Sequence, residues 1–103
     1  IYYDLIEAQQ KKKVKDTAII RIEQLHPFPE KQLKSILKRY KDTKLVWAQE
    51  EPANMGCLSY ILRMMSKYEL EIVSRKASAS PATGYSKVHK VEQEKIVSKA
   101  LEI

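Results

Sequence analysis

Lys44-Leu45-Val46-Trp47-Ala48-Gln49 is the stretch that decides the fold, and Glu50-Glu51-Pro52 follows it directly. A short apolar run that is closed by a proline turn predicts a buried strand. Ala18–Glu23 and Leu70–Ser74 are similarly short and mostly apolar or β-branched, so they predict two further strands. Three such runs, well separated along the chain, point to a sheet whose strands are joined by long connections.

Helical patterns occupy those connections. After Pro29, which suits the first turn of a helix, Leu33, Ile36, Leu37 and Tyr40 follow the i, i+3, i+4, i+7 spacing of an amphipathic helix. Alternating helices and strands predict an α/β fold with three layers, in which helices flank a largely parallel sheet. Three more helices are expected: one with Tyr2, Leu5 and Ile6; one capped by Asn54 with Leu58, Ile61, Leu62 and Met65; and one from Lys87 or Val88 with Ile96, Val97, Ala100 and Leu101.

Length and composition limit the function classes. The chain has 103 residues, 44% of them hydrophobic, which suits one domain with its own core. Its single cysteine excludes an internal disulfide, and its two glycines exclude the glycine-rich phosphate-binding loops. No run approaches the length of a membrane helix, so no membrane partner is expected.

The carboxyl ends of the strands are where functional groups of a parallel sheet gather. One candidate there is the loop from Arg75 to Lys87, which combines cations, hydroxyls and a following helix N-terminus and so suggests an anion or effector site. The alternative is a capped loop of small residues that packs against another domain. The candidate anion-binding residues are Arg75, Ser78, Ser80, Thr83 and Lys87.

A second set of candidates follows the first two strands: His26, Glu50, Glu51 and Asn54. Glu50 and Glu51 are adjacent in an extended segment, so their side chains point to opposite sides and are poorly placed for shared acid–base work. An interface or structural role is therefore expected for this set. Cys57, near the start of a helix, allows a rival hypothesis of a cysteine enzyme with His26, although a buried apolar role for the thiol is favoured.

Three longer motifs carry a resemblance to a known family. Arg21–Pro29 resembles the R-I-E-Q-L-[YH]-P-F-P run of the 2-oxoglutarate dehydrogenase decarboxylating component. Trp47–Gly56 resembles its W-x-Q-E-E-P-x-N-x-G motif, and Ala77–Gly84 matches its A-S-A-S-P-A-T-G motif. The resemblance covers essentially the whole chain, but Cys57-Leu58 departs from the small residue and tryptophan that often follow the second motif.

The resemblance implies that residues 1–103 are a single C-terminal, transketolase-like domain fragment of a larger multidomain enzyme. That enzyme uses thiamine diphosphate and magnesium to decarboxylate 2-oxoglutarate in the tricarboxylic acid cycle and transfers the succinyl group to a lipoyl arm. The family's cofactor motif has no counterpart here, so no catalytic, cofactor-binding or metal-binding residue is carried over, and the fragment alone is expected to be inactive. The family's domain also begins with a strand that is absent before Ile1.

The implied partners are the remaining domains, a homodimer partner and the lipoyl-bearing succinyltransferase component of a multienzyme complex. The implied location is the bacterial cytoplasm or the mitochondrial matrix. From another class, a basic nucleic-acid- or anion-binding module is compatible with the net charge of +6. The lysines, however, are spread over predicted helix faces, and no nucleic-acid-binding motif is present, so no nucleic-acid partner is expected.

Overall fold

The computed structural model describes residues 1–76 and 86–103. Within these residues two helices come first, and from the second helix onward helices and strands alternate as the sequence predicts. The elements are α1 (Tyr2–Lys11), α2 (Glu30–Lys38), β1 (Leu45–Pro52), α3 (Leu58–Met64), β2 (Leu70–Arg75) and α4 (Ser86–Leu101).

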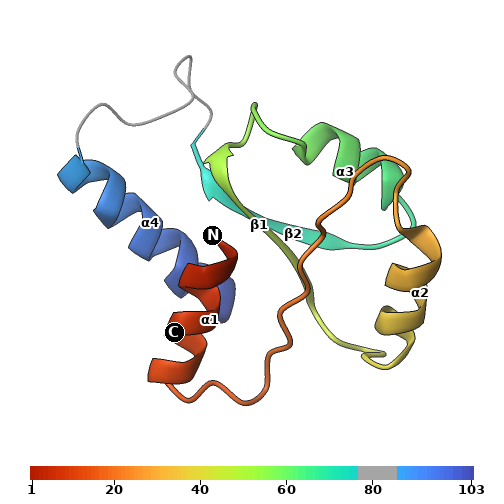
Figure 1. Ribbon diagram of the computed structural model, residues 1–103, viewed down its shortest axis with the longest axis horizontal. Coiled ribbons are helices and arrows are strands. Elements are labelled where there is room, and N and C mark those ends of the chain that lie inside the picture. Colours follow the sequence, from red (N-terminus) through yellow and green to blue (C-terminus); the bar gives the residue numbers. More distant parts are fainter. Residues whose placement is uncertain (77–85) are drawn as a thin grey trace.

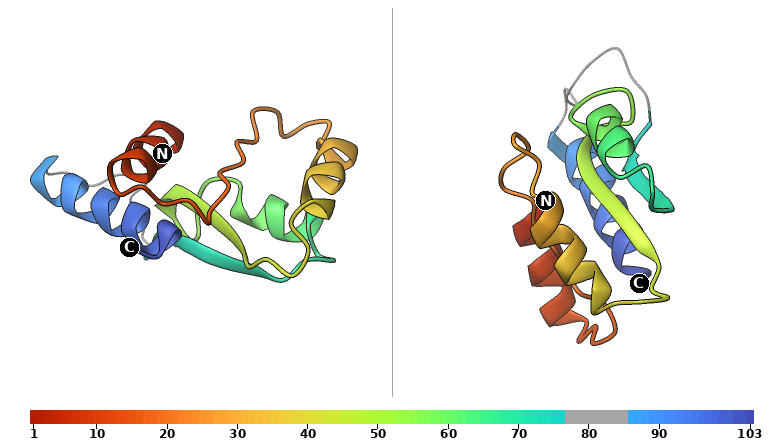
Figure 2. Two further views of the ribbon diagram at one scale, coloured as in Figure 1. Left: turned by 90° about the horizontal axis from the view of Figure 1, so that it is seen from below. Right: turned by 90° about the vertical axis from the view of Figure 1, so that its right-hand side faces the viewer.

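The sheet consists of β1 and β2, which run parallel. Leu45 lies opposite Leu70, and the register shifts after Ala48 so that Pro52 lies opposite Arg75. Helices α1 and α4 lie on one side of the strands and α2 and α3 on the other (Figures 1 and 2). The expected three-layer α/β architecture with a parallel sheet is therefore confirmed.

Two apolar clusters hold the layers together. On the first face, Leu5 of α1 packs with Val97 and Leu101 of α4, and Ala48 of β1 lies against them. On the second face, α2 and α3 contribute a cluster against which Trp47 of β1 packs. Neighbouring residues of a strand point to opposite faces, so β1 supplies side chains to both clusters. The second cluster consists of Leu33, Ile61 and Met65.

The strand predicted at Ala18–Glu23 is wrong. This segment has no regular secondary structure, and no backbone hydrogen bond joins it to β1 or to any other described segment. Its apolar side chains are nevertheless used: Ile19 packs on the first cluster and Ile22 on the second. The apolar pattern identified the side chains that are partly buried, but a strand also requires a hydrogen-bonded neighbour, which the pattern does not show.

Smaller differences concern α3. Asn54 does not cap this helix, because the helix begins at Leu58 and its N-cap residue is Cys57. The residues between Pro52 and Cys57 form turns instead. Leu58, Ile61 and Met65 are buried as expected, whereas Leu62 is 47% exposed. The apolar stripe of α4 is confirmed at Ile96, Val97 and Leu101, which are buried.

Candidate functional site

The turn that follows β1 is organised by the side chain of Gln49, a buried polar residue that is 4% exposed. Trp47 Nε1 donates a hydrogen bond of 2.9 Å to Gln49 Oε1. The side-chain nitrogen of Gln49, Nε2, donates to the backbone carbonyl oxygens of Glu51, Pro52 and Met55 at 3.2, 3.0 and 3.1 Å. Backbone carbonyls that leave a strand need donors when they are buried. Gln49 provides them and so fixes the path of the turn.

Gly56 closes the same turn in a left-handed backbone conformation, with φ of +70°. A Cβ at this position would lie 3.2 Å from the carboxyl carbon of Glu51 and 3.3 Å from its Cβ. Glycine is therefore favoured here by its backbone conformation, and a side chain would also press on the Glu51 side chain. The Glu51 side chain lies over this glycine, away from the side of the strand that Glu50 occupies.

Glu50 lies on the opposite face of the strand, where it joins β1 to the two helices that cover this face, α1 and α4. Its Oε1 forms an ion pair with the amino group of Ile1 and accepts a 2.9 Å hydrogen bond from Gln93 Nε2. The same Gln93 nitrogen donates to Asp4 Oδ2 at 2.8 Å. The predicted divergence of Glu50 and Glu51 is thus confirmed, and residues from three elements meet at this end of the sheet.

The pKa of Glu50 is lowered from its usual range, mainly by the hydrogen bond from the Ile1 amino group, with smaller effects from Gln93 and the charge of Arg75. Partial burial opposes this lowering. Because the pKa of Glu50 is lower in the folded than in the unfolded state, its charged carboxylate stabilises the fold at pH values above the unfolded-state pKa of about 4.3. This stabilisation is lost as the pH falls through the folded-state pKa.

We therefore expect Glu50→Gln to destabilise the 103-residue chain at pH 7 and to have a smaller effect at pH 3. Urea unfolding midpoints of both proteins at the two pH values measure this difference. Glu69→Gln, at an exposed position, is the matched control and should shift neither midpoint. An equal effect of Glu50→Gln at both pH values would show that its charge contributes nothing.

Arg75, the first residue of the predicted anion loop, has a largely buried side chain that bridges β2 and α4. Its Nη2 lies 2.8 Å from His89 Nδ1, and its Nε lies 3.2 Å from Glu92 Oε2. The guanidinium group is therefore used within the chain, where it ties the end of β2 to the first half of α4. Ser78, Ser80 and Thr83 lie outside the described residues, and Lys87 belongs to the first turn of α4. Anion binding by this set stays a prediction.

The other candidates lie apart from this junction. His26 is exposed, and the loop around it is held by the hydroxyl of Tyr60, which donates a 2.6 Å hydrogen bond to the Leu25 carbonyl. Phe28 packs edge-on against the Tyr60 ring, with centroids 6.1 Å apart. Burial raises the pKa of the Cys57 thiol. A thiol with a raised pKa forms less of the reactive thiolate, which argues against the cysteine-enzyme hypothesis.

Sequence reasoning missed Gln49, Asp4 and Gln93. Gln49 had a usable signal, because an amide within an apolar strand and just before a turn must find buried partners. Asp4 and Gln93 are 89 residues apart in sequence, and no local pattern marks them as a pair.

Among residues 1–76 and 86–103, no group of three or more His, Cys, Asp or Glu side chains is placed to hold a metal ion. None of the helices in these residues is long and apolar enough to cross a membrane.

Comparison with known proteins decides the family. Residues 1–101 match the family model described as 2-oxoglutarate dehydrogenase C-terminal. The chain belongs to this family. It is 46% identical over 109 residues to the oxoglutarate dehydrogenase of Buchnera aphidicola subsp. Baizongia pistaciae, with 100% of this chain and 12% of the relative covered.

Two other members of the 2-oxoglutarate dehydrogenase family are matched over a similar share of their length. The chain is 38% identical over 112 residues to the 2-oxoglutarate dehydrogenase E1 component of Azotobacter vinelandii, covering 100% of this chain and 12% of that protein. It is 38% identical over 109 residues to the mitochondrial 2-oxoglutarate dehydrogenase of Dictyostelium discoideum, covering 98% and 11%. The chain thus spans only about an eighth of the length of these relatives.

The family assignment confirms the resemblance seen in the sequence, and the structure gives physical reasons for two of its motifs. In Trp47–Gly56, Gln49 holds the turn, Glu50 joins the helices of the first layer, and Gly56 permits the left-handed turn. In Arg21–Pro29, Leu25 and Phe28 are anchored on Tyr60. The Ala77–Gly84 motif lies outside the described residues.

Proposed function

We propose that this chain serves as the C-terminal domain of a 2-oxoglutarate dehydrogenase that decarboxylates 2-oxoglutarate with thiamine diphosphate and magnesium and transfers the succinyl group to a lipoyl-bearing partner. Its own role is structural: residues 1–103 form a single domain that supports the catalytic domains and contributes to a homodimer. The family match over residues 1–101 is the observation that carries this proposal.

The geometry of the strand ends supports the structural role. Side chains that an active site would direct at a substrate are here directed at the chain itself: Gln49 at backbone carbonyls, Glu50 at Gln93, and Arg75 at Glu92 and His89. Such contacts fix the positions of α1, β1, β2 and α4 relative to one another. The cofactors and the reacting groups then belong to the other domains of the longer protein.

Exposed apolar side chains on α3 support contact with other domains or with a second subunit. Leu62 is 47% exposed and Met64 is 37% exposed. Neighbouring apolar side chains at a surface are typical of interaction sites.

The relatives include bacterial proteins and a mitochondrial one, so we place the parent enzyme in the bacterial cytoplasm or the mitochondrial matrix. Nothing in the fold or the comparisons favours the nucleic-acid-binding alternative.

An activity assay tests the proposal directly. The longer protein that carries this chain should reduce an artificial electron acceptor when it is supplied with 2-oxoglutarate, thiamine diphosphate and magnesium. The 103-residue chain at equal molar concentration should give only the blank rate. Turnover by the 103-residue chain alone would contradict the structural role, and failure of the longer protein to use 2-oxoglutarate would contradict the proposed activity.

A further inference from the structure

The net positive charge of the chain lies mostly on one side of the sheet. Helices α2 and α3, with the turns that follow them, comprise residues 30–42 and 58–67. These residues hold seven lysines and arginines against two acidic residues, so they carry five of the six net positive charges of the chain. All seven basic residues are exposed, and we call them the basic face: Lys31, Lys34, Lys38, Arg39, Lys41, Arg63 and Lys67.

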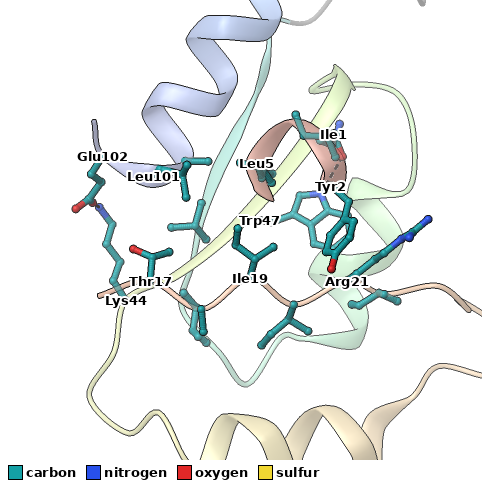
Figure 3. A pocket seen from close by; sticks show the side chains of 18 of the residues that line it. Ile1, Tyr2, Leu5, Thr17, Ile19, Arg21, Lys44, Trp47, Leu101 and Glu102 are labelled. Carbon is teal, nitrogen blue, oxygen red and sulfur yellow. Dashed lines mark hydrogen bonds and ion pairs between the residues drawn. The ribbon is translucent and has the colours of Figure 1, made fainter. Parts of the chain in front are cut away.

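The basic face is not neutralised within the part of the chain that the structure describes. Among residues 1–76 and 86–103, no ion pair involves any of its seven side chains. Lysines outside the basic face do have such partners: Lys11 pairs with Glu7 at 3.1 Å, and Lys44 pairs with Glu71 at 2.6 Å. Figure 3 shows that Lys44 also pairs with Glu102, and both residues line the pocket beside β1.

Three lysines of α2 form a stripe on its exposed side. Lys31, Lys34 and Lys38 are separated by three and four residues, so they are neighbours on the helix surface. Leu33 lies on another side of the helix and is buried in the second cluster. Like charges at these spacings destabilise a helix, because they repel one another. A negatively charged partner removes this repulsion and so stabilises α2.

Exposed apolar side chains accompany the basic face. Leu62 and Met64 of α3 are 47% and 37% exposed, and Tyr40, in the turn after α2, is 42% exposed. Between Leu62 and Met64 in sequence is Arg63, whose guanidinium group lies over the Tyr60 ring, 5.6 Å from its centroid. Tyrosine, methionine and arginine are enriched in protein interfaces. Because α2 and α3 cover the same face of the sheet, the charged and apolar groups belong to one layer (Figures 1 and 2).

We propose that the basic face, together with Leu62 and Met64, is a docking surface for an acidic segment of a separate polypeptide. Carboxylates of this segment pair with the lysines and arginines, and its apolar side chains cover Leu62 and Met64. Permanent interfaces are more apolar than this surface and are depleted in lysine. A lysine-rich surface therefore suits a contact that forms and dissociates. The proposal rests on the proposed function only in that this chain is part of a longer protein.

Other polyanions fit this surface less well. A membrane surface takes up the apolar side of an amphipathic helix, but Leu33 and Leu37 on the apolar side of α2 pack within the domain. Single-stranded nucleic acid is bound by stacking of its bases on aromatic side chains. Tyr40 is the only exposed aromatic residue in residues 30–42 and 58–67. A polypeptide supplies both the carboxylates and the apolar groups that this surface lacks.

Peptide binding to the longer protein tests the proposal. The probe is a fluorescein-labelled peptide of glutamate and serine with two central leucines, and anisotropy at about 0.15 M salt measures its affinity. The triple variant Lys31→Gln, Lys34→Gln, Lys38→Gln should bind it about 10-fold more weakly, the combined effect of three exposed ion pairs. The triple variant Lys12→Gln, Lys15→Gln, Lys99→Gln removes the same charge from other exposed positions and should bind as the unmodified protein does.

Leu62→Ser tests the apolar part of the surface without changing its charge. This variant should bind the leucine peptide about 5-fold more weakly, because less apolar surface is buried. A peptide with serines in place of the leucines should bind both proteins equally. Circular dichroism verifies that each variant is folded. Turnover of 2-oxoglutarate by the same variants should be unchanged, which separates a failure of docking from a failure of the proposed activity.

Four outcomes would overturn the proposal. The first is no binding of the leucine peptide to the unmodified longer protein. The second is an equal loss of affinity in the two triple variants, since net charge alone would then explain binding. The third is unchanged affinity of Leu62→Ser for the leucine peptide. The fourth is tighter binding of phosphatidylglycerol vesicles or of a single-stranded oligonucleotide than of the peptide, because the surface would then serve a different polyanion.

Discussion

Gln49→Leu should lower the free energy of unfolding of the 103-residue chain by about 3–4 kcal/mol. The leucine fills a similar space but removes the Gln49 hydrogen bonds to the Trp47 Nε1 donor and to the carbonyls of Glu51 and Met55, whereas the Pro52 carbonyl keeps the hydrogen bond from the Met55 N–H. Each buried polar group that loses its only partner costs about 1–3 kcal/mol, and partial access to water and added apolar burial reduce the sum. Urea unfolding followed by Trp47 fluorescence measures the change.

Gln24→Leu is the matched control for this substitution. Gln24 also donates its side-chain amide to a backbone carbonyl, that of Pro27 at 3.3 Å, but it is exposed. Water replaces a lost hydrogen bond at such a position, so the control should change stability by less than about 0.5 kcal/mol. Similar effects of the two substitutions would mean that burial of the Gln49 amide is not what matters.

Gly56→Val should cost about 2–4 kcal/mol and disturb the turn between β1 and α3. A β-branched residue is strained at φ of +70°, and the added Cβ lies within 3.3 Å of the Glu51 side chain. Left-handed backbone alone costs a residue with a side chain about 1–2 kcal/mol, and more when the side chain is branched. Thermal unfolding followed by circular dichroism provides the measurement.

A double-mutant cycle separates the two causes. The cycle consists of Gly56→Ala, Glu51→Ala and the double variant. Gly56→Ala and the double variant share the same backbone strain but differ in the contact with the Glu51 carboxyl group. If the contact matters, the double variant should be more stable than the sum of the single effects predicts. Additive effects would assign the whole cost to the left-handed backbone, and a neutral Gly56→Ala would contradict both explanations.

The parts of the fold that are marked by local patterns were predictable. The helical spacing around Leu33 and Leu37 predicted α2, and the apolar runs around Trp47 and Ile72 predicted β1 and β2. Alternation of these elements gave the layers, because a helix and a strand that are each apolar on one side must cover one another. Local patterns describe each element alone, and for these elements that was sufficient.

Partners that are distant in sequence were not predictable in this way. Ala18–Glu23 has the composition of a strand, yet pairing depends on which backbone lies beside it, and no backbone hydrogen bond joins this segment to β1. The candidate site shows the same limit. Divergence of Glu50 and Glu51 follows from strand geometry, whereas the contact of Glu50 with Gln93 depends on how α4 packs. The buried role of Gln49 follows from tertiary burial, although its position within an apolar strand was visible.

The contact between α1 and α4 has a consequence for synthesis of the protein. Leu5 is covered by Val97 and Leu101, and Asp4 accepts a hydrogen bond from Gln93. Within this domain α1 is synthesised before α4, so the apolar side of α1 stays uncovered until the residues up to Leu101 have been added. Contacts of such wide sequence separation slow folding, and exposed apolar surface attracts other chains in the meantime. Until α4 has been made, α1 thus exposes the apolar side that Val97 and Leu101 later cover.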